Sequence, residues 1–310
     1  MAVHYRAVYI RQFYKLDFMS LQIATDTVPI VAARPKIDIE SLVEMTLPPS
    51  PGNIMRLSRL LSDENTPTRE ITKAIGYEPI LAVRILRLAN STIYGLERNV
   101  TSIQAAISAI GNKTLGEIVL MELASSTFAK QIHNSFFARK IWEHSLAVAM
   151  ISREMAQLLK IKGTEEVFTC GLLHDLGKLV LLSYDFNGFP LLQGENDEER
   201  MLEGERLNYG YDHAQIGSLV AARWKLQAEI CNAIQDHHHP TLSEFPSMVT
   251  HIIEVADIVA NSRAYGLRME NGDRLLTCDS VQKLNLTPED LEVIWGRAEE
   301  KIREAIYSYA

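Results

Sequence analysis

The chain is poor in cysteine, and that scarcity bears on where it works. It has three cysteines, which are far apart, odd in number and without C-x-x-C spacing: Cys170, Cys231 and Cys278. Disulfide frameworks of secreted proteins need paired cysteines at close spacings. The sequence therefore predicts a protein of a reducing cytoplasm.

Long apolar runs are also missing. No stretch approaches the roughly 18 apolar residues that a membrane span needs. The N-terminal segment Met1–Arg6 is followed by the charged residues Arg11, Lys15 and Asp17, so no apolar signal region follows it. We expect no membrane contact and a cytoplasmic location.

An excess of basic residues is absent as well. The 31 basic and 39 acidic residues give a net charge of −8, and no dense Lys/Arg stripe interleaved with aromatics is present. Nucleic acid is therefore not an expected partner. The chain does have 310 residues, 47% of them hydrophobic and 23% charged, which predicts a folded protein of two packed units or one large helical body.

Sequence breakers and helical periodicity divide the chain into three parts. Residues 1–40 mix aromatic, β-branched and charged residues, and a short strand pair and a docking arm both fit this pattern. The prolines of Leu47–Pro51 cannot continue a helix. We expect an N-terminal helical lobe over 41–135 and a second helical lobe over 136–310, in an all-α fold without alternating strand patterns.

Caps and breakers predict where individual helices begin and end. Thr66 is expected as an N-cap before Pro67, with Gly76 as the stop. His174 and Asp175 are expected on one helix, and Glu195–Arg200 as a solvated loop leading into a helix near Glu198. The other predicted helices are 79–90, one from a capping box at Thr101 to Gly111, one from a capping box at Thr114 towards Phe128, 136–160, one from about 209 through Trp224, 227–238 and 248–262.

Asp257 is the most informative single residue. Helical spacing puts it on the same face as Ile253, Ala256 and Ala260, which is the buried stripe of its helix. A buried carboxylate needs a positive partner. Lone histidines are more often ordinary core or surface residues than ligands, and we interpret His4, His133, His239 and His251 in that way.

Seven residues beyond position 140 bring metal-ligand side chains to places where a helix would normally carry neutral ones. They are His144, His174, Asp175, His213, His237, His238 and Asp257. Imidazoles and carboxylates from several helices are how helical proteins build metal sites, and the set suits iron or manganese, with zinc and nickel as alternatives. Two metals bridged by Asp175 would acidify a bound water and hydrolyse phosphate esters.

The order of these residues resembles the HD superfamily of metal-dependent phosphohydrolases. Within it, Leu47–Pro51, Arg84–Ser91 and Val100–Ile103 resemble the HDOD family, the HD-related output domain of bacterial signalling proteins. The resemblance implies an all-α HD-like lobe, the seven residues above as ligands of a binuclear centre, Asp175 bridging, and Lys178 near a substrate phosphate. It also implies a role in signal transduction with a partner protein, often without demonstrated hydrolase activity.

The chain departs from the active cyclic-dinucleotide phosphodiesterases of that superfamily. His239–Leu242 lacks their Gly-Tyr-Pro signature, and position 140 is lysine where a carboxylate ligand would stand. Three functions therefore stay open. They are a regulatory module with a metal-loaded HD site, a metallophosphohydrolase with Asp175 and Lys178 as catalytic residues acting on a nucleotide or cyclic dinucleotide, and a helical scaffold in which charge pairs replace metal.

Overall fold

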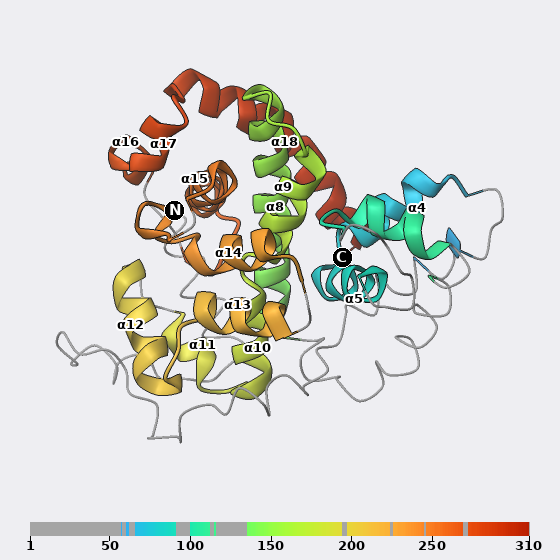
Figure 1. The fold of residues 1–310 in the computed structure, drawn as a ribbon. Helices are drawn as coiled ribbons and strands as arrows, with labels where there is room; N and C mark the ends of the chain where they lie inside the picture. The colour runs from blue at the N-terminus through green and yellow to red at the C-terminus, as the bar shows by residue number, and fades with distance from the viewer. Residues whose placement is uncertain are drawn as a thin grey trace.

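The structure of the protein is a computed structural model built of helices (Figure 1). It describes residues 57, 60, 61, 66–90, 100–111, 115, 135–193, 197–223, 226–244, 246–268 and 272–309. No strand occurs within these ranges, so the predicted all-α class is confirmed. The helices are α4 (Thr68–Ile75), α5 (Pro79–Ala89), 103–111, α8 (Phe136–Leu158), α9 (Thr164–Leu173), α10 (Leu176–Tyr184), α11 (Phe189–Leu192), α12 (Glu198–Tyr209), α13 (His213–Arg223), α14 (Ala228–Asp236), η3 (Pro240–Leu242), α15 (Met248–Ser262), α16 (Arg274–Thr277), α17 (Asp279–Lys283) and α18 (Pro288–Tyr309).

Helix α8 is the central element of the body. It begins after Ser135, whose side chain accepts a hydrogen bond from the backbone N–H of Ala138 at 3.4 Å. From Ser145 to Ile151 every residue is buried, and a helix that is buried on all sides lies inside its domain. Helices α9, α15 and α18 pack along it (Figure 1).

Several predicted helix boundaries agree with the structure, and two caps do not. Helix α15 covers the predicted range, and α5 ends one residue earlier than predicted. Thr66 is not an N-cap, because the capping position is Pro67, whose side chain makes no cap bond. Thr101 is not one either, since the Ser102 hydroxyl accepts from the N–H of Ala105 at 3.2 Å. The predicted capping box at Thr114 lies outside the described residues.

Two glycines set the distance between α10 and α13. A Cβ added to Gly177 would stand 1.8 Å from the carbonyl oxygen of His213, and one added to Gly217 would stand 2.9 Å from the backbone nitrogen of Gly177. The two backbones therefore touch, which only residues without a side chain allow. This approach brings Asp175, just before α10, next to His213 at the start of α13.

The two predicted lobes share one hydrophobic cluster in the described part of the chain. Helix α5 of the N-terminal half packs against α9, and Trp142 Nε1 of α8 donates a hydrogen bond to the carbonyl oxygen of Tyr77 at 2.6 Å. The boundary between 135 and 136 stays a prediction. The predicted N-terminal arm, residues 1–40, lies outside the described residues.

One stretch of the described chain, Glu166–Tyr184, is long and apolar enough to meet the length and composition of a membrane span. It comprises most of α9, the turn at His174 and Asp175, and α10. Of that window, 78% is buried inside the body of the protein. Its apolar character is therefore accounted for by core packing, and the cytoplasmic location stays a prediction.

Candidate metal centre

His174 and Asp175 lie in a turn between two helices, and the prediction that one helix carries both is wrong. Helix α9 ends at Leu173, and Asp175 has left helical geometry, with φ −96° and ψ 17°. The side chains of His174 and Asp175 are 0% and 1% exposed. Because the helix is interrupted here, both side chains lie in the interior. In a continuous helix, two neighbouring residues would point in different directions.

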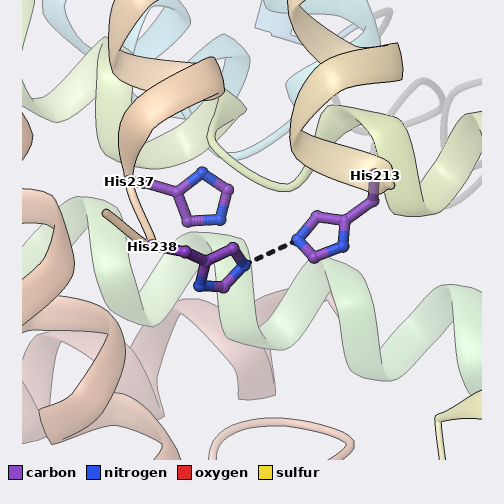
Figure 2. Close-up of side chains that lie close together, drawn as sticks. All are labelled: His213, His237 and His238. Atoms are coloured by element: carbon purple, nitrogen blue, oxygen red, sulfur yellow. Dashed lines mark hydrogen bonds between the residues drawn. The ribbon is translucent and has the colours of Figure 1, made fainter. Parts of the chain in front are cut away.

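All seven predicted ligands are buried and lie around this turn. They come from five places in the chain: His144 from α8, His174 and Asp175 from the turn, His213 from the first residue of α13, His237 and His238 from the turn after α14, and Asp257 from α15. Figure 2 shows the rings of His213, His237 and His238 facing one another. Each of the seven residues belongs to a group of three whose candidate ligand atoms lie within 4.8 Å of one another.

The Asp175 carboxylate stands between two sets of imidazoles. Its Oδ2 lies 3.6 Å from His144 Nε2 and 3.5 Å from His174 Nε2. Its Oδ1 lies 3.3 Å from His213 Nε2 and 3.9 Å from His237 Nε2. Each oxygen therefore faces its own set of nitrogen atoms.

The other ring nitrogen of several histidines is held by an acceptor. In His144, Nδ1 lies 2.7 Å from the carbonyl oxygen of Tyr265. In His174 it lies 2.8 Å from the carbonyl oxygen of Gly171, and in His237 it lies 2.6 Å from that of Ile234. A carbonyl only accepts, so Nδ1 carries the proton and Nε2 presents a lone pair. Metal-bound histidines are held in this way.

Several of the inward-facing atoms make no hydrogen bond, whereas His238 Nε2 and His213 Nε2 share one at 2.9 Å. Among the described residues, His144 Nε2, His174 Nε2, His237 Nε2 and Asp175 Oδ1 are buried without one. Burial lowers the pKa of His174 to about 4 and that of His237 well below its usual value, so these rings are neutral. Buried electron-pair donors that converge without a proton between them fit a bound cation.

The contact between His144 and Asp257 supports the same fit. His144 Nε2 lies 2.8 Å from Asp257 Oδ1, while its Nδ1 proton is directed at Tyr265. Asp257 is 4% exposed and also accepts from Asn261 Nδ2 at 2.8 Å. A lone pair facing a carboxylate at this distance is repulsive unless a cation or a proton lies between them.

Lys178 is directed at the centre from α10. Its Nζ donates to Asp175 Oδ2 at 2.8 Å. Burial works against both charges, yet the pairing lowers the pKa of Asp175 well below its usual value and raises that of Lys178. The predicted contact of Lys178 with a phosphate stays a prediction.

Two glutamates of α12 were missed by the sequence reasoning. Glu205 is 0% exposed, and its Oε2 accepts from both the backbone N–H and Nδ1 of His213, each at 2.7 Å. The helix predicted to begin near Glu198 does begin there, as α12. The predicted solvation of Glu198 is wrong, because its side chain is 10% exposed and contacts His238. Both share a helix face with buried Leu202, the same signal that singled out Asp257.

Histidines interpreted as ordinary residues agree with that view where they are described. His251 is buried with Nδ1 2.5 Å from the Ser280 hydroxyl oxygen, and His239 is exposed beside Glu199. Lysine at position 140 pairs with Glu143 at 2.8 Å and offers the centre no carboxylate. His4 and His133 lie outside the described residues.

A small cavity of about 20 Å³ adjoins the centre. Its lining residues come from α8, α10, α12, α15 and the segments next to α10, α11 and α15, and include His144, Asp175, Lys178, Gln193, Asn261 and Arg268. A space of this size holds a water molecule.

The fold and the site together define a class. An all-α body with a His-Asp turn at its centre, surrounded by histidines and an aspartate from four other places in the chain, is an HD-like protein. The family model of the HDOD domain matches residues 47–240, and the chain belongs to the HDOD family.

Solved structures with this fold include a response regulator and a virulence factor. The MmoQ response regulator from Methylococcus capsulatus str. Bath is 22% identical with a TM-score of 0.64, over 80% of this chain and 97% of that one. A virulence factor from Campylobacter jejuni subsp. jejuni is 20% identical with a TM-score of 0.60, over 86% and 95%. At these identities the likeness shows the fold alone.

Curated relatives match a smaller share. An uncharacterized protein of Treponema pallidum (strain Nichols) is 24% identical over 201 residues, which are 62% of this chain and 38% of the relative. A ribonuclease Y of Pelobacter propionicus is 32% identical over 139 residues, 44% and 21% of the two chains. The chain thus spans well under half the length of these relatives.

Proposed function

We propose that this HDOD protein is a regulatory module whose HD-type centre holds divalent metal, with hydrolysis weak or absent. The observation that carries the proposal is a set of three buried atoms without a hydrogen bond, His174 Nε2, His237 Nε2 and Asp175 Oδ1. A helical scaffold without metal would leave these three acceptors uncompensated.

The arrangement around Asp175 supports two metal positions. One would be held by His144, His174 and Asp257 with Asp175 Oδ2, and the other by His213, His237 and His238 with Asp175 Oδ1. Mixed imidazole and carboxylate donors suit iron or manganese, with zinc or nickel as alternatives. When bound, such a pair supplies a strongly acidified water.

The cavity beside Asp175 and Lys178 argues against turnover on that side of the centre. Its volume of about 20 Å³ has room for water, whereas sites for small-molecule ligands enclose roughly 300 Å³ or more. A nucleotide at Lys178 would need the surrounding helices to move, and the cleft of about 510 Å³ lined by His238 does not include Lys178. We therefore propose a signalling partner protein, in the cytoplasm, that responds to the state of the centre.

A second candidate is a metal-dependent phosphohydrolase acting on a nucleotide or cyclic dinucleotide. The observation that favours it is Lys178, a buried cation beside Asp175 that also lines the cavity. Some curated relatives carry the name ribonuclease Y, and that name describes the activity of those relatives. In this function Asp175 would bridge the metals and Lys178 would contact the phosphate.

Metal analysis tests the proposal directly. Protein purified without chelator is expected to contain at least one metal ion per chain, and His174→Ala/Asp175→Ala to contain nearly none. The exposed neighbour variant His239→Ala is the matched control and should retain the full amount. Unmutated protein with less than about 0.2 metal per chain after incubation with Fe²⁺ or Mn²⁺ would refute the metal centre.

A substrate panel separates the two functions. Nucleotides and cyclic dinucleotides are assayed with Mn²⁺ and Fe²⁺, and the regulatory proposal expects no turnover above the Asp175→Ala background. Turnover that disappears in Asp175→Ala and falls in Lys178→Ala would establish the phosphohydrolase instead.

A further inference from the structure

Glu198 begins α12 with a carboxylate that is largely buried. The Asp197 side chain caps α12 by accepting from the N–H of Arg200 at 3.0 Å, so Glu198 is not needed for the cap. Its side chain is 10% exposed and it points inward, whereas the next residue, Glu199, is 61% exposed. Burying a carboxylate here is costly without specific partners.

Three side chains meet the Glu198 carboxylate. Arg268 Nη2 lies 2.5 Å from Oε2, and Arg274 donates from Nη1 to Oε2 at 2.6 Å and from Nη2 to Oε1 at 2.8 Å. His238 Nδ1 lies 3.2 Å from Oε1. The carboxylate therefore links a predicted metal ligand to an arginine beside the cavity and to an arginine of α16.

The contact with His238 fixes which ring nitrogen faces the centre. With Nδ1 at Glu198, the Nε2 of His238 points to His213 Nε2 at 2.9 Å (Figure 2). Two Nε2 atoms at this distance leave room for one proton or one cation to be shared.

Glu198 also reaches the surface. Arg274 and His238 line a cleft of about 510 Å³ together with Glu199, Thr277 and Asp279. In α16 the N–H groups of Leu275 and Leu276 bond backward to the carbonyls of Gly272 and Asp273, each at 3.0 Å. Hydrogen exchange of those two amides therefore reports whether the turn of α16 is formed.

We propose that Glu198 is a positioning residue that orients His238 towards the metal and couples metal occupancy to α16 through Arg274. The proposal rests on the proposed metal centre. Metal on Nε2 makes the Nδ1 proton a stronger donor, which shortens and orders the bond to Glu198 and holds the carboxylate in place for Arg274.

Linkage makes the coupling measurable from both ends. If metal stabilises the formed turn of α16 through Arg274, the formed turn must raise metal affinity by the same factor. A carboxylate that only neutralises two arginines would affect stability and would leave both quantities unchanged.

The experiment measures two quantities in the full chain. Mn²⁺ affinity is determined by competition with a chromophoric chelator, and hydrogen exchange of the Leu275–Leu276 segment is followed with and without Mn²⁺. Glu198→Ala should weaken Mn²⁺ binding by about 10- to 100-fold. Glu198→Gln, which keeps an oxygen acceptor for Nδ1, should recover part of that loss.

Two further variants separate positioning from coupling. Arg274→Gln should retain Mn²⁺ affinity within a few-fold but lose the slowing of α16 exchange by Mn²⁺. Glu199→Gln removes the neighbouring exposed charge and should behave as the unmutated protein in both measurements.

Each contrary result has its own meaning. Unmutated affinity in Glu198→Ala and Glu198→Gln would show an arginine anchor only and overturn the proposal. If the hydrogen-exchange rates of the Leu275–Leu276 segment in the unmutated protein are the same with and without Mn²⁺, the coupling is overturned. Failure of the unmutated protein to bind Mn²⁺ at all would instead refute the proposed metal centre. If Glu198→Ala does not fold, Glu198→Gln and Arg274→Gln decide.

Discussion

Asp257 shows at the scale of one residue how a single charge connects fold and site. It lies on the buried face of α15, 2.8 Å from His144 Nε2, and is 4% exposed. As a ligand it would balance the charge of the cation. As half of a structural charge pair it would balance a protonated His144.

Asp257→Asn distinguishes these roles. We expect the variant to lose metal and to melt at the temperature of chelator-treated unmutated protein, because the amide keeps the shape and the bond from Asn261 while removing the charge. Added metal should restore little stability. Thermal melts with and without chelator make the comparison. A structural pair would cost roughly 3 to 5 kcal/mol more, and the variant would then melt well below the stripped protein.

His251 is a buried histidine outside the centre, and it makes a prediction for pH. Its Nδ1 faces the Ser280 hydroxyl, which donates to Glu254 and so accepts from the ring. Burial, with Lys283 nearby, lowers the pKa of His251 below its usual value. The unfolded state then binds the proton more tightly, so the stabilisation is present above about pH 6.5 and is lost as pH falls through the folded pKa.

The test compares His251→Asn with unmutated protein, both with chelator. Asparagine keeps a donor near the Nδ1 position but does not titrate. We expect unmutated protein to lose more unfolding free energy between pH 7.5 and 5 than the variant, measured by urea unfolding. Parallel pH profiles would mean that His251 is protonated equally well in the folded state.

At the scale of the element, the contact of α10 with α13 places half of the centre. Gly177 and Gly217 let the backbones touch, and this fixes Asp175 against His213. The same device recurs at Gly171, where an added Cβ would lie 2.9 Å from Ala149 Cα between α9 and α8. Glycine here serves close packing within helices that it would otherwise weaken.

Gly177→Ala should therefore separate the two helices. We expect destabilisation by about 1 to 3 kcal/mol or more from overpacking, together with weaker metal binding. Gly296→Ala in α18 is the control, since an added Cβ there meets nothing within 4 Å, and it should be neutral or stabilise by roughly 0.5 to 1 kcal/mol. Urea midpoints and metal content give both answers. Equal stability of the two variants would contradict the close contact.

At the scale of the whole molecule, the N-terminal half is joined to the HD-like half by packing of α5 on α9 and by the bond from Trp142 to Tyr77. Two lobes that share a core unfold together, whereas independent lobes do not.

Trp142→Phe tests this junction. Loss of the indole donor should lower the unfolding free energy by about 0.5 to 1.5 kcal/mol, with the urea slope unchanged. Unfolding is followed by circular dichroism, with Phe137→Tyr, a change at a partly buried ring on the same helix, as the control for substitution alone. A reduced slope in Trp142→Phe would show that the halves had become independent.

The sequence by itself determined the all-α class and the bounds of α15, because helical period and breakers act over a few residues. It also singled out Asp257, since a charged group on an apolar face needs a partner wherever the chain runs. The other six ligand candidates were selected by their order along the chain, which resembles the HD superfamily, and all seven are buried. The same rule applied to α12 would have found Glu198 and Glu205, since both fall on the face of Leu202.

Only the tertiary structure decided how these residues meet. The break of the helix at His174 and Asp175 depends on surrounding packing, and the division of the Asp175 oxygens between two sets of histidines depends on the contact of α10 with α13. The joining of Glu198 to Arg268, Arg274 and His238 brings together residues up to 76 positions apart. Such contacts carry no local signal, because the free energy that selects them comes from burial shared among many helices.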